Sequence, residues 1–182
     1  MSKLSQAIAE GDGISILVEV ADAASATAAE KQGADGLAVR SGANAVRASS
    51  QLPLLYFGTM FDARGVAADA VVIRSDLAMW HEANALGLEP VVRVSESDDL
   101  AHALEQFDPG VFLLAAEPGS DDDPLEALLG LLHDVPAGKL AIAELHDATP
   151  DDVAELERSG VDAVLVAPRD VAALISDDPP DV

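Results

Sequence analysis

The sequence predicts an α/β fold: a single minimal (β/α)8 barrel, or TIM barrel, with eight parallel strands and short helices. Short apolar runs alternate with helical patterns along almost the whole chain, as in a parallel sheet covered by helices. A Gly-(Val/Ala)-Asp motif also recurs before three of these runs, at Asp35, Asp69 and Asp162, with the glycine lost from the second copy. Repeated βα units suit a barrel or an open doubly wound sheet. Eight consecutive units without an antiparallel edge strand favour the barrel.

The clearest unit covers residues 139–167. Residues 140–145 form an apolar run with one charge, Glu144, as expected of a buried parallel strand. Thr149 and Pro150 then supply a capping hydroxyl and a proline at the first helical position. Gly160 follows the last helical turn, where a left-handed stop costs least, and residues 161–166 form the next strand. Two parallel strands joined by a helix make a βαβ unit.

The other elements follow from the same signals. Apolar runs between turn residues predict strands, and helical spacing behind a capping residue predicts helices. We expect strands at 14–20, 36–40, 52–57, 70–74, 90–94, 111–116, 140–145 and 161–166. We expect helices at 2–10, 23–32, 43–49, 60–67, 77–86, 97–107, 124–133, 150–159 and 169–175.

Composition indicates one domain with a core of small residues. The 182 residues are enough for one sizeable core, so we expect a single barrel over residues 1–176 and a flexible acidic tail over 177–182. Hydrophobic residues make up 49% of the chain but aromatic residues only 3%, so Ala, Val and Leu must fill the core. The sequence contains no cysteine, which excludes disulfides, thiol catalysis and cysteine-bound metals. Without a membrane-spanning apolar run or a signal peptide, we expect a cytoplasmic protein that does not bind membranes.

The formal net charge is −23, from 33 acidic and 10 basic residues. Binding to a nucleic-acid backbone needs a basic face, so we expect no nucleic-acid partner. An acidic surface keeps a protein in solution, and adaptation to high salt is an alternative that the composition leaves open. The expected partner is a small anionic metabolite, and the protein is expected to be a monomer or a small homo-oligomer.

Arginines gather at the predicted carboxyl ends of the strands, where barrels place their sites. Four of the seven arginines fall there: Arg40, Arg74, Arg93 and Arg169. One interpretation is a ligand pocket for a carboxylate or a phosphate, which the planar guanidinium group suits. The alternative is internal pairing, in which Glu19 and Glu144 neutralise Arg40, Arg74 or Arg93 inside a narrow barrel.

Three residues are candidates for catalysis. Glu19 and Glu144 are charges within apolar strands, where they could transfer protons or balance arginines. His146 could supply an acid beside Asp147, although a loop histidine is more often an ordinary surface residue. The other three histidines fall on predicted helices without carboxylate partners, so we expect no metal site. We expect no cofactor.

Several stretches carry a family resemblance: residues 85–94 with the helix start at 98–100, residues 160–167, and the apolar strands at 16–20 and 52–55. On these stretches the chain resembles the indole-3-glycerol-phosphate synthase family, as a divergent and shortened member. The resemblance implies a (β/α)8 barrel. It also implies a carboxy-lyase of tryptophan biosynthesis that acts on carboxyphenylamino-deoxyribulose phosphate without a cofactor.

The resemblance maps most of the family's functional positions onto different residues. Glu19 and Glu144 match the glutamates of strands one and seven. The lysines of strands one and three fall on Ala21 and Phe57, and the strand-five glutamate falls on Arg93. The strand-six asparagine and arginine fall on Ala115 and Glu117. The phosphate-binding motifs after strands seven and eight become Leu145-His146 and Ala167-Pro168-Arg169.

Three functional hypotheses stay open. The first is a catalytically degenerate barrel that keeps a small anionic-metabolite site at its rim, built from the four clustered arginines. The second is an active lyase that uses Glu19 and Glu144, with His146 as a substitute acid. The third is a non-catalytic scaffold whose rim charges only pair with one another.

Overall fold

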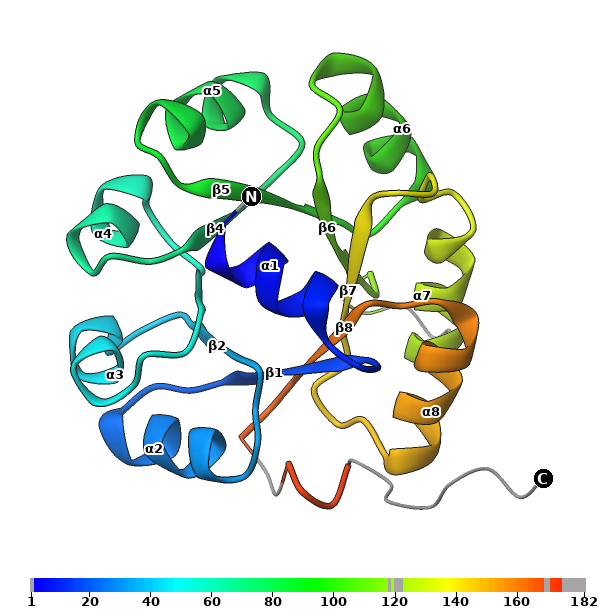
Figure 1. The fold of residues 1–182 in the computed structure, drawn as a ribbon. Helices are drawn as coiled ribbons and strands as arrows, with labels where there is room; N and C mark the ends of the chain where they lie inside the picture. The colour runs from blue at the N-terminus through cyan, green and yellow to red at the C-terminus, as the bar shows by residue number, and fades with distance from the viewer. Residues whose placement is uncertain (1, 118, 120–122, 169–170, 175–182) are drawn as a thin grey trace.

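The computed structural model describes residues 2–117, 119, 123–168 and 171–174. Eight parallel strands pair in chain order and β8 pairs back with β1, so the sheet closes into a barrel (Figure 1). The fold class predicted from the sequence is therefore confirmed. The strands are β1 (Ser15–Glu19), β2 (Gly36–Val39), β3 (Leu54–Tyr56), β4 (Ala70–Ile73), β5 (Glu89–Val94), β6 (Val111–Ala115), β7 (Leu140–Glu144) and β8 (Ala163–Val166).

Of the eight helices in the described residues, α2 to α8 surround the barrel and α1 covers one end of it (Figure 1). The covering helix is α1 (Lys3–Glu10), whose Leu4 and Ile8 pack among the side chains inside the barrel. Ser5 donates a hydrogen bond to Glu89, the first residue of β5, at 2.9 Å, so α1 closes the amino-terminal end of the strands. The outer helices are α2 (Ala23–Lys31), α3 (Ala43–Ser49), α4 (Met60–Gly65), α5 (Leu77–Ala85), α6 (Ser97–Gln106), α7 (Pro124–Leu132) and α8 (Pro150–Ser159).

The unit from β7 to β8 forms as its sequence predicts. Thr149 caps α8 in a capping box with Asp152, each side chain bonding to the backbone of the other. Pro150 occupies the first turn, where no backbone N–H is needed. Gly160 ends the helix with φ of 92°, a conformation that side-chain-bearing residues rarely adopt.

The structure corrects two expected elements. Strand β3 covers only Leu54–Tyr56 rather than 52–57, because Pro53 has no N–H to give to the ladder. The expected helix at 169–175 is not formed in its described part: residues 171–174 make a turn in which Leu174 donates to the carbonyl of Val171 at 2.9 Å. Residues 169, 170 and 175 and the expected tail at 177–182 lie outside the described residues.

Two apolar cores follow from the alternation of side chains along each strand. The inner core fills the barrel with small and branched residues, so the barrel is packed rather than hollow. The outer core lies between the sheet and the helices and includes Phe112, a fully buried aromatic residue. The composition predicted this reliance on Ala, Val and Leu. None of the described helices has the length and hydropathy needed to cross a bilayer.

The recurring aspartates connect neighbouring strands at the amino-terminal end of the barrel. Asp35, just before β2, accepts the N–H of Ile16 on β1 at 2.8 Å. In the same way Asp69 accepts from Leu54 at 2.9 Å and Asp162 accepts from Ala141 at 2.7 Å. Each carboxylate thus satisfies an N–H near the start of the preceding strand. The repeated motif is a structural device of the fold.

Candidate functional site

The carboxyl-terminal rim of the barrel carries a ring of six inward-facing positions, five of which hold charged side chains and one of which holds Phe57. Side chains two positions apart on a strand share a face, so each of these follows a residue of the inner core. Six residues lie two positions after an inner-core residue on their strand: Glu19, Arg40, Phe57, Arg74, Arg93 and Glu144. The corresponding inner-core residues are Leu17, Ala38, Leu55, Val72, Val91 and Ile142. The rim therefore brings together most of the residues singled out in the sequence.

Glu144 is the centre of this ring. Its Oε1 accepts from Arg40 Nη2 at 2.8 Å, and its Oε2 accepts from Arg93 Nε at 2.8 Å. The Glu144 side chain is only 6% exposed. A carboxylate so far from water needs charged partners, and here two guanidinium groups supply them.

Glu19 extends the network on the other side. Its Oε2 accepts from Arg40 Nε at 3.0 Å and lies 3.1 Å from His146 Nε2. His146 Nε2 also lies 3.9 Å from Glu144 Oε1. The three proposed catalytic residues, Glu19, Glu144 and His146, are therefore in mutual reach, with Arg40 between the two carboxylates.

Phe57 also contacts Arg40. The guanidinium carbon of Arg40 lies 3.9 Å from the centre of the Phe57 ring, within range of a cation–π contact. Two carboxylates and one aromatic face thus surround Arg40. Sequence reasoning treated Phe57 only as the replacement of a family lysine and missed its contact with Arg40. Its place two residues beyond Leu55 is the signal that could have placed it on the rim.

The four arginines of the predicted anion pocket do not act as one group. Arg40 and Arg93 both bind Glu144, as the internal-pairing alternative expects. Arg74 is exposed, and no described side chain pairs with it. Arg169 lies outside the described residues.

Arg74 instead opens onto a separate recess between the ends of β4 and β5. The recess has a volume of about 430 Å³ and is lined by Arg74, Ser75, Asp76, Arg93, Ser95 and Asp99. Arg93 gives only its Nε to Glu144, and it lines this recess as well. Two guanidinium groups and two hydroxyl groups suit the recognition of an oxyanion. Asp99 was expected only at the start of a helix, and nothing in the sequence assigned it to the rim.

A second hollow lies on the other side of Arg93. It has a volume of about 310 Å³, and its polar lining consists of Arg93, Glu144, His146 and Asp147. Asp147 is exposed and makes no hydrogen bond with His146 within the described ranges. The carboxylate partner of His146 is Glu19, which is distant in sequence. No three His, Asp or Glu side chains of the described chain are arranged to hold a metal ion.

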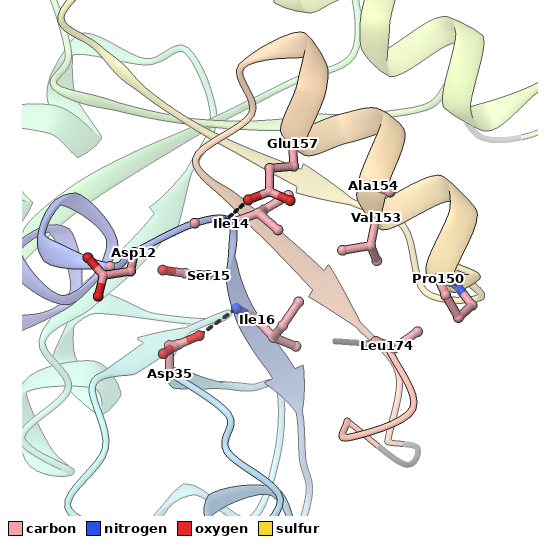
Figure 2. Close-up of a pocket in the computed structure, with 12 residues that line it drawn as sticks. Asp12, Ile14, Ser15, Ile16, Asp35, Pro150, Val153, Ala154, Glu157 and Leu174 are labelled. Atoms are coloured by element: carbon pink, nitrogen blue, oxygen red, sulfur yellow. Dashed lines mark hydrogen bonds between the residues drawn. The ribbon is translucent and has the colours of Figure 1, made fainter. Parts of the chain in front are cut away.

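A third hollow, a groove away from the rim network, lies between β1 and α8 (Figure 2). It has a volume of about 330 Å³ and is lined partly by Asp12, Asp35 and Glu157. Asp35 accepts the N–H of Ile16, and Glu157 accepts the N–H of Ile14 at 3.3 Å (Figure 2). Two of its three acids therefore hold the start of β1, which is a structural task.

Comparison with known proteins gives relatives by sequence and by fold. No protein-family model matches this chain. The indole-3-glycerol phosphate synthase of Variovorax paradoxus (strain S110) is 31% identical over 180 residues, which cover 90% of this chain and 64% of that protein. The synthase of Aromatoleum aromaticum (strain DSM 19018 / LMG 30748 / EbN1) is 32% identical over 135 residues, which cover 67% of this chain and 52% of that protein. The chain thus spans less than two thirds of the length of these curated relatives.

Two solved structures share the fold. The N-acetylmannosamine-6-phosphate 2-epimerase of Clostridium perfringens superposes with a TM-score of 0.70 at 13% identity and covers 87% of this chain and 88% of its own. A thiamine phosphate pyrophosphorylase from Pyrococcus furiosus reaches a TM-score of 0.67 at 18% identity, covering 88% of each chain. Likeness at this identity concerns the barrel alone. The sequence matches confirm the resemblance predicted above: this (β/α)8 barrel is a divergent relative of the indole-3-glycerol phosphate synthases.

Proposed function

We propose that this barrel binds a small anionic metabolite, a carboxylate or a phosphate, at its carboxyl-terminal rim and no longer catalyses the ring closure of its relatives. The observation that carries the proposal is the recess lined by Arg93 and by Arg74, whose side chain has no partner among the described residues. Arg64 is likewise exposed without a carboxylate partner among the described residues, but Arg74 differs from it because it lines a recess together with a second arginine, Arg93. An anionic ligand would give Arg74 the partner that the described protein does not.

The residues at the catalytic positions support the loss of the synthase reaction. Ring closure with decarboxylation and dehydration needs a proton donor near the carbonyl and a base opposite it. By the resemblance, Ala21 and Phe57 stand where the family has lysines, and Phe57 contacts Arg40 rather than offering a proton. Glu144 keeps its position but is bound by two arginines, which hold it as a paired carboxylate.

A thermal melt tests the proposal. We would measure Tm with inorganic phosphate, with acetate, and with carboxyphenylamino-deoxyribulose phosphate, and analyse the last sample for indole product. A ligand at 100 times its Kd stabilises by about 2.7 kcal/mol, or about 5 to 10 °C for a domain of this size. We expect a rise in Tm with at least one anion and no product.

The Arg74→Ala variant should lose this rise in Tm, while Arg64→Ala, which removes an exposed arginine on α4, should keep it. If neither these anions nor any other ligand that carries a carboxylate raises Tm, the paired rim charges favour the scaffold hypothesis instead.

One observation favours a second function, the lyase. His146 lies 3.1 Å from Glu19 at the edge of the hollow that Glu144 lines, so an acid and two carboxylates are within reach of one space. Formation of indole product by the unmodified protein, abolished by His146→Ala and by Glu144→Gln, would support this function. Turnover that survives Glu144→Gln would contradict it.

A further inference from the structure

We propose that the recess between β4 and β5 binds a zwitterion of the α-amino-acid class, with Arg74 facing the carboxylate and Asp99 facing the ammonium group. This inference rests on the proposed function, because it uses the same recess, and it adds the chemical class of the ligand. It assigns a role to Asp99, which is outside the paired network at the centre of the rim.

The charges of the recess divide into partnered and unpartnered groups. Arg93 is bound to Glu144 at 2.8 Å, and Asp76 accepts the N–H of Met79 at 3.0 Å as the cap of α5. The side chains of Arg74 and Asp99 have no hydrogen-bond or ion-pair partner among the residues that the structure describes. One positive and one negative group are therefore left to meet a ligand.

A ligand with both charges fits this pair better than a simple anion. A phosphate beside Arg74 would also face Asp76 and Asp99, and like charges at short range oppose binding. An amino acid carries its carboxylate and its ammonium group close together and is neutral overall. It can therefore pair with Arg74 without adding a net negative charge beside the two aspartates.

The rest of the lining agrees with a small polar ligand. The Ser75 hydroxyl is buried and has no hydrogen-bond partner within the described part of the chain, and Ser95 adds a second hydroxyl to the wall. A buried hydroxyl without a partner is destabilising, so a ligand that reaches it would gain a bond that the protein lacks. The volume of about 430 Å³ is within the range of small-molecule pockets.

The test is a thermal melt with each of the twenty standard amino acids in turn, followed by calorimetric titration of those that raise Tm. Each active amino acid is then compared with two analogues, its α-hydroxy acid, which lacks the ammonium group, and its decarboxylated amine, which lacks the carboxylate. We expect both analogues to bind at least about tenfold more weakly, because each loses one charge-assisted contact.

Matched variants assign the contacts. Arg74→Ala should weaken binding of the amino acid and of its hydroxy acid, while Arg64→Ala should change neither. Asp99→Asn should weaken binding of the amino acid at least about tenfold, and binding of the hydroxy acid should be unchanged or tighter. Asp98→Asn removes the same charge from the neighbouring position of α6, which does not line the recess, and should have little effect.

The outcomes separate this inference from the proposed function. Suppose that inorganic phosphate or the hydroxy acid binds as tightly as any amino acid and that Arg74→Ala abolishes that binding. The proposal of a zwitterionic ligand is then wrong, and the proposed anion site is supported. If neither an anion nor an amino acid raises Tm, both are wrong. Amino-acid binding that Asp99→Asn leaves intact would also overturn the role of Asp99.

Discussion

Both ends of the barrel carry carboxylates, but the two ends satisfy them differently. At the amino-terminal end Asp35, Asp69 and Asp162 each accept a backbone N–H from the neighbouring strand. At the carboxyl-terminal end Glu19 and Glu144 accept from arginine side chains. A backbone donor is present whatever the residue, so the contacts of Asp35 and Asp162 depend on the fold alone, whereas Asp69 also accepts from Arg47 Nη2 at 3.2 Å. Side-chain donors can be exchanged one by one, which leaves the carboxyl-terminal end free to change its chemistry.

The largest loss of stability is expected for a substitution at the carboxyl-terminal end of the barrel. Glu144→Ala leaves Arg40 and Arg93 facing each other without their shared carboxylate. Breaking a buried pair costs about 3 to 5 kcal/mol, and we expect about 3 kcal/mol because both guanidinium groups keep some contact with water. Urea denaturation measures the loss. Glu96→Ala, at an exposed cap position without a side-chain hydrogen bond, is the control. A loss as small as that of the control would show that the network contributes nothing to stability.

A smaller effect is expected at the amino-terminal end. Asp162→Ala leaves the N–H of Ala141 without its acceptor, and an unsatisfied buried donor costs about 1 to 3 kcal/mol. Asp162→Asn keeps an acceptor oxygen and should lose less. Urea denaturation gives the free energies, and hydrogen exchange should be faster at the Ala141 amide in the alanine variant. Equal losses in the two variants would mean that charge, rather than the hydrogen bond, matters at this position.

Phe57→Leu should lower the free energy of unfolding by a still smaller amount. The variant keeps an apolar residue next to Arg40 but removes the aromatic face, and a cation–π contact at a partly exposed site is worth about 0.5 to 1 kcal/mol. A double-mutant cycle with Arg40→Met isolates this contact from the lost volume of the ring. A coupling energy of zero would show that Phe57 only fills space.

The smallest effect concerns Asp22, the exposed cap of α2. Hydrogen bonds from the backbone N–H and the hydroxyl of Ser25 hold the pKa of Asp22 below its ordinary value of 3.8. Its contribution to stability is therefore present above the ordinary pKa and is lost as pH falls through the lower pKa of the folded state. Relative to Asp22→Asn, the unmodified protein should have a higher Tm at neutral pH, and this advantage should disappear in acid. A constant difference would contradict the assignment.

The sequence could predict features that depend on neighbours in the chain better than contacts between distant residues. The presence and order of the strands, the capping hydroxyl of Thr149 and the stop at Gly160 depend on neighbours in the chain, and these local signals predicted them correctly, although the bounds of β3 were too wide. The recurring aspartates were visible as a motif, but their task was not, because each bonds to a backbone N–H on another strand. Backbone donors leave no trace in the sequence.

The rim was predicted as a location but not as a set of contacts. The rule that barrel sites lie at the carboxyl ends of strands brought Glu19, Arg40 and Glu144 together. Which arginine pairs with which glutamate depends on strand register and side-chain length, since Arg40 and Glu144 are 104 positions apart in the chain. For that reason the sequence grouped Arg74 with Arg40, whereas the structure gives the two arginines different surroundings.

The pairing of β8 with β1 has a consequence for how the chain folds. The partners Ser15 and Ala163 belong to the first and the last strand of the barrel, so this seam joins segments that are synthesised far apart in the chain. Until β8 emerges, β1 exposes an open edge that can pair with strands of other nascent chains. We therefore expect synthesis speed and chaperone access to affect the yield of this barrel, since the β1–β8 pairing joins the two strands that are farthest apart in the sequence.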